Sequence, residues 1–452
     1  MGVRDQIVKF SCARPGRVMA VSLLAGTAVA GAAYASGLGL VNQNSDAVAH
    51  AYAGVTVEND PAISYYNPAG MVLIDGNQLE ESFNIYSIHS SFSGSDNNPL
   101  LLPAVTSGSA RGYLESTLVP GTFSVISLPH GIKAGLSVTV PIGGRIKYPD
   151  NFVGQFQGTE ALVTTIQVGL AIAIPITSQL SIGFGPEINW FQNILSTNEN
   201  LGFPVAGTFT GKGYGIGFNA GLLYQLSPET RFGLDYRSKI DQKFKGTESI
   251  SSTNPIIEGI FGNGPGQFPP ASPAFDKWAF PQQISLGIWQ QVTPRLSVMF
   301  SALWTNWAQE TGLTITDPST TILTDGAVYT PFKYRNTWTL AAGASYELTP
   351  ALTLMGGAGY DESPVKTIYR EDLVPDADRT MLGCGASLQL TPAVKAVLAY
   401  QHIIVANNSI SQTRLQLGSD GSLNPAGIGS GNLTGEYKTS ADVFSASIIG
   451  KF

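Results

Sequence analysis

From Gln78 onward, apolar and polar side chains alternate along the chain with a period of two, which predicts β-strands with two different faces. The clearest example is Gly213–Leu226, where one face is apolar with tyrosine near both ends and the other face is mainly glycine. Residues 337–348 repeat this design, and residues 231–237 carry charged side chains on the second face. An apolar face bounded by aromatic residues is typical of a strand that faces lipid, whereas a charged face belongs in a watery lumen.

A soluble β-sandwich or propeller also has alternating strands, and its apolar face would form the core. The alternating stretches here are much longer than the five or six residues, roughly, of an ordinary strand. We therefore favour a membrane barrel over a soluble fold.

Six short turns divide the alternating region, and each contains proline, serine or threonine. Proline fixes φ, and serine or threonine bonds the nearby backbone, so these sequences favour tight turns. The turns lie at 128–131, 176–180, 226–229, 292–296, 348–352 and 390–394. Six turns between seven long hairpins predict a 14-stranded antiparallel barrel over residues 77–452.

Longer segments rich in Gly and Pro separate the other strand ends, and we expect them to be loops on the opposite side of the barrel. They lie near 92–112, 197–211, 248–275, 315–328 and 415–432. The last strand ends in Phe452, and a terminal aromatic residue fits the signal that such barrels present to their assembly machinery.

Residues 36–76 lack this alternation and are dominated by Gly, Ala, Ser, Asn and Val. Ser45 is expected to cap a short helix over 46–53, which Gly54 closes. The segment is too small to bury a core of its own and too apolar for a simple tail. We predict that it folds as a plug inside the barrel.

Residues 1–35 have the pattern of a signal peptide, with a basic start, an apolar centre and the small-x-small site Ala33-Tyr34-Ala35. Cleavage after Ala35 would leave 21 basic and 31 acidic residues, a net charge of −10, which disfavours nucleic acid as a partner. Cys384 would then be the remaining cysteine, so no intrachain disulfide is expected.

Charged residues make up 13% of the chain, about half of the proportion that is usual for globular proteins, and the mean hydropathy is only +0.10. No apolar run after the N-terminus reaches the roughly 18 residues that a membrane helix needs. The apolar residues are thus spread over strands, as a β-barrel requires.

The sequence gives little support to an enzyme such as a barrel phospholipase, because it has no G-x-S-x-G motif. Its histidines are scattered and not spaced for a metal site: His50, His89, His130 and His402. Glu362, Asp376 and Asp378 are suitable calcium ligands, but acids near a barrel rim are usually just solvated. We expect no metal and no cofactor. A general porin is disfavoured because a forty-residue plug, roughly, would block bulk flow.

Several motifs together give the chain a family resemblance. They are Asn67-Pro68-Ala69, Gly211–Gly215, Asn219–Gly221, Tyr236–Ser238, Phe244–Gly246, Trp304–Trp307, Asp361–Val365 and Pro375–Arg379. In order and spacing the chain resembles the FadL/TodX family of outer-membrane transporters of long-chain fatty acids and hydrophobic compounds, over essentially all of residues 36–452. No single motif is decisive.

The resemblance implies a monomeric barrel in the outer membrane of a Gram-negative bacterium, with an N-terminal hatch marked by Asn67, Pro68 and Ala69. It also implies that a hydrophobic ligand first sits in a groove among the extracellular loops and then in a pocket beside the hatch. Without energy input, the ligand leaves sideways into outer-membrane lipid through a gap at a kinked third strand. A cost of ~0.8 kcal/mol per CH₂ in water makes this route favourable for an acyl chain.

The matching kink lies within Leu136–Tyr148, where Pro141, Gly143 and Gly144 interrupt the strand pattern. Proline removes a ladder donor and adjacent glycines favour a bulge. The resemblance places a lateral gate here, and an ordinary bend of the barrel is the alternative.

Loop 248–275 carries apolar side chains, including Ile257, Ile260, Phe261 and Phe268. They are candidates for the outer groove, although they fit equally well as residues that pack the loop onto its neighbours. The loop 197–211 is short, whereas fatty-acid members pair a long third loop with the fourth, so the outer site differs from theirs.

Fatty-acid carriers of the family place basic residues after the fifth strand and before the tenth. The matching stretches 193–201 and 324–330 contain no Lys or Arg, and Lys333 and Arg335 are the nearest candidates for head-group contact. A neutral hydrocarbon is therefore an open alternative to a fatty acid as the substrate.

Overall fold

The computed structural model describes residues 39–97, 105–200, 204–251, 272–310, 312–316, 327–413, 415–417, 423–425 and 431–452. The predicted signal peptide (residues 1–35) lies outside the described residues, as do the groove candidates Ile257, Ile260, Phe261 and Phe268. Within the described ranges, no helix is both long and apolar enough to cross a membrane.

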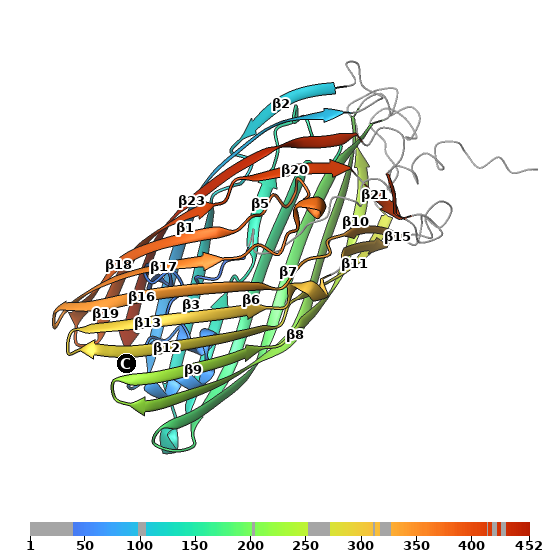
Figure 1. The fold of residues 1–452 in the computed structure, drawn as a ribbon. Helices are drawn as coiled ribbons and strands as arrows, with labels where there is room; N and C mark the ends of the chain where they lie inside the picture. The colour runs from blue at the N-terminus through green and yellow to red at the C-terminus, as the bar shows by residue number, and fades with distance from the viewer. Residues whose placement is uncertain are drawn as a thin grey trace, which may run out of the picture.

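The strands form one antiparallel sheet that closes on itself, because β1 (Gln78–Asn97) pairs with β23 (Asn432–Lys451) from Gln78↔Lys451 to Asp96↔Leu433 (Figure 1). Fourteen barrel-spanning strands, here called staves, make up this barrel, and seven of them consist of two shorter strands in line.

Between β1 and β23 the staves are, in chain order, β2 with β3 (Val105–Arg111, Thr117–Ser127), β4 with β5 (Lys133–Thr139, Gly143–Lys147), β6 (Glu160–Pro175), β7 (Leu180–Asn200), β8 (Pro204–Ser227), β9 with β10 (Thr230–Arg237, Ile240–Ser251), β11 with β12 (Ser272–Phe280, Gln283–Thr293), β13 with β14 (Leu296–Thr305, Gly312–Thr316), β15 with β16 (Ala327–Pro331, Thr337–Thr349), β17 (Leu352–Asp361), β18 (Arg379–Thr391), and β19 with β20 (Val394–Val405, Asn408–Thr413). A separate hairpin joins β21 (Leu415–Leu417) to β22 (Leu423–Pro425).

The period-two pattern correctly predicts which side chains face outward. Tyr214 and Ile216 on β8 are 70% and 65% exposed, and Trp338 and Leu340 on β16 are also exposed. Asn219, on the other face of β8, is buried in the interior. The prediction of a fourteen-stranded barrel with an apolar outer face is confirmed.

The six predicted turns all connect neighbouring strands, but two of the predicted loops are wrong over much of their length. Over 92–112, β1 continues to Asn97 and pairs with β2 from Ser91↔Arg111 to Asn97↔Val105. Instead of a loop over 197–211, β7 continues to Asn200 and β8 begins at Pro204, with Asn193 opposite Gly211. Gly211 is needed there because a Cβ would lie 2.7 Å from the buried Phe209 ring. The glycines that suggested a loop therefore make room for aromatic packing inside a strand.

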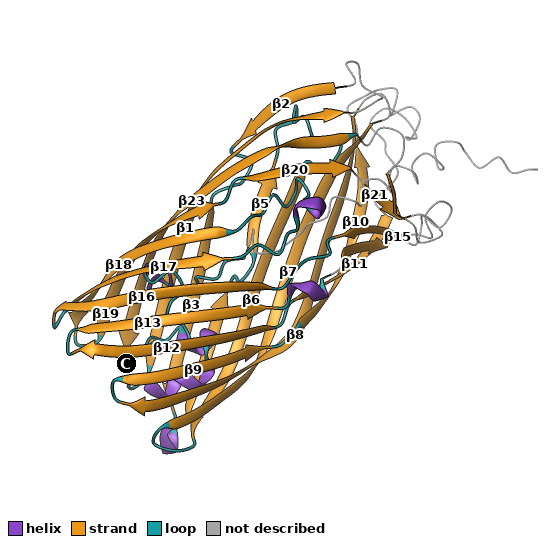
Figure 2. Ribbon diagram, in the orientation of Figure 1, coloured by secondary structure: helices purple, strands orange, loops and turns teal. Residues whose placement is uncertain are grey.

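The plug lies inside the barrel, toward the end that carries the short turns (Figure 2). Its described part, residues 39–76, contains α2 (Ser45–Ala49), α3 (Ile63–Tyr66) and the 3₁₀ helix η2 (Pro68–Leu73). Most of its side chains are buried.

The predicted helix over 46–53 is shorter than expected, and its cap is different. Asn44 caps α2 by accepting a bond from the Ala47 N–H, while the Ser45 hydroxyl lies 2.7 Å from Ser445 Oγ on the wall. Ala51 and Tyr52 have φ of 52° and 82°, so the backbone leaves the helical region after Ala49. Tertiary contact with the wall thus overrides the local cap signal.

Candidate functional site

The backbone pairing between the second stave (β2 with β3) and the third stave (β4 with β5) is interrupted. β3 pairs with β4 up to Thr122↔Val138, and the same register resumes only at the isolated bridge Leu114↔Ile146. Within the described stretches 116–121 and 139–144, no ladder pair joins these two staves. We call this gap the wall opening.

All three predicted gate residues lie on one edge of the wall opening. Pro141 follows the end of β4, and Gly143 and Gly144 begin β5. Opposite β6, the pairing shifts by one residue between Thr139↔Gln167 and Gly143↔Thr164, so the stave contains a bulge. Gly144 has φ of 152°, a value that side chains other than glycine rarely tolerate.

The side chain of Gln43 in the plug occupies the place that a neighbouring strand would take at the wall opening. Its Nε2 donates to Val140 O and its Oε1 accepts from Val140 N, both at 3.0 Å. Leu40 N donates to Pro141 O at 3.0 Å, and Gly39 forms an antiparallel bridge with Ile142. The first described residues of the plug therefore satisfy the backbone that the bulge leaves unpaired.

Tyr66, a residue further along the plug, holds this segment in place through its hydroxyl. Its hydroxyl accepts from Gln43 N at 2.7 Å and donates to Val41 O at 3.0 Å. Burial raises the pKa of Tyr66 well above its ordinary value, so the phenol keeps the proton that it donates.

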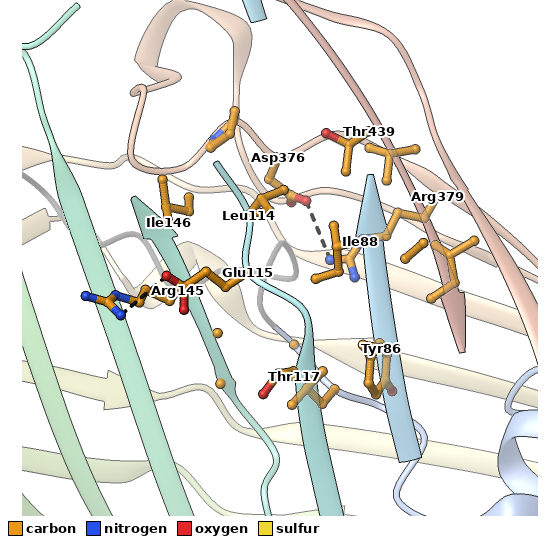
Figure 3. Close-up of a pocket in the computed structure, with 18 of the residues that line it drawn as sticks. Tyr86, Ile88, Leu114, Glu115, Thr117, Arg145, Ile146, Asp376, Arg379 and Thr439 are labelled. Atoms are coloured by element: carbon orange, nitrogen blue, oxygen red, sulfur yellow. Dashed lines mark hydrogen bonds and ion pairs between the residues drawn. The ribbon is translucent and has the colours of Figure 1, made fainter. Parts of the chain in front are cut away.

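A cavity of about 1020 Å³, part of it open to solvent, lies directly inside the wall opening (Figure 3). Its lining is mostly apolar, and it includes the plug residues 39–42, Thr117 on one edge of the opening and 143–146 on the other. This first cavity therefore touches the plug and both edges of the opening.

The loop between β17 and β18 (residues 362–378) folds inward and contributes Leu373–Asp376 to the first cavity. Leu373 and Val374 are buried in one apolar cluster with Tyr113 and Tyr148, and the Tyr148 hydroxyl donates to Asp372 O at 2.7 Å. The loop therefore forms part of the wall of the first cavity.

Each basic residue on the described lining of the first cavity is next to a carboxylate (Figure 3). Arg145 lies 2.7 Å from Glu160 and 3.3 Å from Glu115. Arg379 is 3.5 Å from Asp376, and 3.8 Å separates it from Asp361. These guanidinium groups are already neutralised before any ligand enters.

A second cavity, of about 810 Å³, lies on the other side of the plug segment 39–41. Tyr52, Tyr65, Phe280 and Trp307 give it an aromatic lining. The two cavities share residues 39–41 and Asp361, so the start of the plug stands between them.

Arg237 is the basic residue in the described lining of the second cavity, and it also holds the plug. Its Nε lies 2.9 Å from Glu187, its Nη2 donates to Tyr65 O at 2.6 Å, and its guanidinium stacks 4.1 Å from the Tyr65 ring. Asn219 donates to the same carbonyl at 3.0 Å. Arg237 and Asn219 therefore fasten α3 of the plug to β9 and β8.

The predicted plug motif Asn67-Pro68-Ala69 binds the wall at β7 and β8. Asn67 is fully buried, caps η2 through Ala69 N, and donates to Leu222 O at 3.2 Å. Ser181 donates to Ala69 O at 3.0 Å. These bonds hold the middle of the plug, not the segment at the wall opening.

Lys333 and Arg335, the predicted head-group contacts, lie outside both cavities. Arg335 bonds Ser363 O at 2.8 Å and pairs with Asp378 at 3.2 Å, while Lys333 lies 5.2 Å from the Tyr369 ring. Among the described residues, no group of three or more His, Cys, Asp or Glu side chains has the geometry to hold a metal.

Sequence reasoning does not find Gln43 or the role of Arg237. Arg237 lies in the Tyr236–Ser238 motif, where a cation on the lumen face of a strand is a usable signal. Nothing local distinguishes Gln43, because its partner Val140 is 97 residues away.

Comparison with known proteins agrees with the geometry. The profile of the family described as outer membrane protein transport protein (OMPP1/FadL/TodX) matches residues 26–452. A long-chain fatty acid transport protein of Escherichia coli O6:H1 is 26% identical over 306 residues, which cover 62% of this chain and 68% of that protein.

Two solved structures share the fold. The crystal structure of a Pseudomonas aeruginosa FadL homologue has a TM-score of 0.78 and 24% identity, and it covers 92% of this chain and 99% of that one. The toluene transporter TodX of P. putida has a TM-score of 0.67 and 15% identity, with 91% and 99% covered.

Proposed function

Since the chain belongs to the outer membrane protein transport family (OMPP1/FadL/TodX), we propose that it takes up long-chain fatty acids by passive diffusion through the wall opening. As a member of this family, it is an outer-membrane transporter of hydrophobic compounds in a Gram-negative bacterium and not an enzyme. The fatty acid and the sideways route are our proposal.

The observation that supports the route is the contact between the first cavity and the wall opening. In the described part of the chain, the plug residues 39–43 and the edges of the opening lie between this cavity and the outer surface of the wall. In our mechanism, those residues move aside and the acyl chain passes from the cavity into the bilayer. Each CH₂ then avoids a cost of about 0.8 kcal/mol in water.

A disulfide across the wall opening tests this mechanism. Gly39 and Ile142 are antiparallel bridge partners, and such pairs have Cα atoms roughly 4.5–5.5 Å apart, within the range for a disulfide. In a Cys384→Ser background, the oxidised Gly39→Cys/Ile142→Cys variant should lose uptake about tenfold or more, and a reductant should restore it.

The matched control is Ser95→Cys/Thr434→Cys, which joins paired residues of β1 and β23 within the wall. This disulfide crosslinks two staves without touching the plug, and uptake should not depend on its redox state. Normal uptake by the oxidised Gly39–Ile142 variant would contradict the gate.

Neutral hydrocarbons are a second candidate class of substrate. The basic residues in the described linings of the two cavities are Arg145, Arg379 and Arg237, and each lies next to a carboxylate. A carboxylate ligand would have to compete with these partners, whereas a neutral ligand would not. The relative TodX is named as a toluene transporter.

Ligand extraction from detergent-purified protein, followed by mass spectrometry, identifies what co-purifies. Competition between a radiolabelled long-chain fatty acid and an alkane of equal length then separates the two classes. Saturable acid binding that is lost in Lys333→Gln/Arg335→Gln would assign the head-group contact to these residues. Binding of the alkane alone would select the hydrocarbon alternative.

A further inference from the structure

Four acidic side chains meet where the plug contacts the wall near the short turns. Asp46, Glu58 and Asp60 come from the plug, and Glu80 comes from β1. The Nδ2 atom of Asn44 lies 3.4 Å from Asp60 Oδ2 and 3.3 Å from Glu80 Oε1, so one amide bridges an acid of the plug and an acid of the wall. We call these four residues the carboxyl cluster.

The cluster is buried more deeply than its charge would normally permit. Asp46, Asp60 and Glu80 are 7%, 4% and 0% exposed, whereas the Glu58 side chain retains 18%. In the described structure, Asp46 Oδ2, Glu58 Oε1 and Glu80 Oε2 accept no hydrogen bond. A buried carboxylate oxygen without a partner is costly, and protonation lowers this cost.

Three basic groups face the cluster from the elements around it. Lys395 on β19 attracts all four acids, and Arg231 on β9 attracts Glu58. His50 Nδ1 lies 3.4 Å from Glu58 Oε1, and its Nε2 lies 2.8 Å from Ser345 Oγ on β16. With His50 neutral, two positive charges face four carboxyl groups, so the cluster has an excess of acid.

Burial, assisted by the neighbouring Asp46, raises the pKa of Glu58 to about 7. The same two causes raise the pKa of Asp60, and burial lowers the pKa of His50. Glu58 and Asp60 therefore exchange protons near neutral pH. Glu58 and the exposed Asn59 beside it give solvent protons access to the cluster.

We propose that the carboxyl cluster is a proton-operated latch, which holds the plug against the wall when it is protonated and releases it when it ionises. This inference rests on the proposed function, in which the plug moves during transport. It adds a control by pH to that movement.

The sign of the effect follows from proton linkage. An exposed Glu or Asp has a pKa of about 4, so the seated plug binds protons that the released plug does not. The latch is strongest below about pH 4, weakens as the pH rises, and is lost above the raised pKa near 7. Raising the pH thus favours release of the plug.

Hydrogen exchange on the intact wild-type protein in detergent tests the latch. Protection factors, corrected for the intrinsic rate at each pH, are measured for peptides within residues 44–60 at pH 5.5 and pH 8.5. We expect protection of these peptides to fall about tenfold or more at the higher pH. Peptides from β17 and β18 are the internal control, because their wall pairing contains no cluster acid.

Glu58→Gln/Asp60→Asn should keep the plug protected at both pH values, because amides cannot ionise. Asp75→Asn is the matched control, since Asp75 is an exposed acid of the same segment that pairs with Lys451 outside the cluster. This control should retain the wild-type response. If the double variant does not show the heat-modifiable migration of a folded barrel, Glu58→Gln alone serves, with a reduced response expected.

Two results would overturn the latch proposal. One is wild-type protection of residues 44–60 that is the same at pH 5.5 and pH 8.5. The other is a full pH response of this protection in folded Glu58→Gln/Asp60→Asn. Neither result bears on the Gly39–Ile142 disulfide test. Conversely, uptake that ignores this disulfide would overturn the gate while leaving the pH response of the plug measurable.

Discussion

The plug is held very differently on two sides of the barrel. Along β8 and β9, Arg237 of the wall donates to the plug backbone at Tyr65 O, and Asn67 of the plug donates to the wall backbone at Leu222 O. Along β17 and β18, the plug chain lies directly on wall glycines. At the wall opening, neutral hydrogen bonds of Leu40 and Gln43 hold it. The difference indicates that the plug is held strongly where the wall is continuous and more weakly at the wall opening. The segment at the opening is therefore the part of the plug whose movement breaks the fewest contacts with charged or closely packed groups.

The largest effect is expected from breaking the anchor at Arg237. Arg237→Met leaves Glu187 buried without its cation, and removing one partner of a buried pair costs ~3–5 kcal/mol. The free energy of unfolding, measured with denaturant in detergent, should fall by about this amount. Arg295→Met, in an exposed turn, is the control and should change stability by less than about 0.5 kcal/mol. If Arg237→Met and Arg295→Met have the same free energy of unfolding, the proposal that Arg237 anchors the plug is wrong.

A smaller effect is expected from a methyl group at the glycine contact of the anchored side. In Gly357→Ala, the new Cβ would lie 2.1 Å from His50 O, so backbone must shift. Overpacking of this kind costs ~1–3 kcal/mol, readable as a lower thermal midpoint. At the adjacent Gly356, the nearest atom to a Cβ is 3.8 Å away, so Gly356→Ala should be nearly neutral. A neutral Gly357→Ala would show that the plug adjusts easily on this side.

The smallest effect on stability, but a clear effect on transport, is expected at the opening. Gln43→Ala leaves the N–H and C=O of Val140 without their partner, and closure of the plug segment should weaken by ~1–3 kcal/mol. Unfolding of the whole barrel should hardly change, while leakage of a hydrophobic dye through proteoliposomes rises about tenfold. Gln179→Ala, in an exposed turn, is the control. Unchanged leakage would mean that Gln43 does not keep the opening closed.

The sequence predicts the barrel well because strand alternation and tight turns each depend on residues that are adjacent in the chain. The alternation around Tyr214 and the turn at 348–352 each depend on a few adjacent residues. The pattern at Pro141 and Gly143 likewise indicates the bulge, although only the register shows that the wall opens there.

The candidate site is less predictable because it depends on contacts between distant residues. Asn44, adjacent to Gln43, replaces the expected cap Ser45, because the wall at Ser445 binds the serine hydroxyl. At the carboxyl cluster, Asn44 of the plug bonds Glu80 of the wall, which lies 36 residues further along the chain. Hydropathy and turn rules contain no information about which lumen side chains meet across the barrel.

The two hydrogen bonds between the Gln43 side chain and the Val140 backbone also bear on the tendency of the barrel to aggregate. A strand whose N–H and C=O groups lack a neighbour is a template for another extended chain, and such edges promote strand addition and aggregation. An amide side chain presents one donor and one acceptor, so it masks this edge without forming a permanent ladder. The seated plug therefore masks this unpaired edge, and in the proposed mechanism each opening of the gate would expose it briefly.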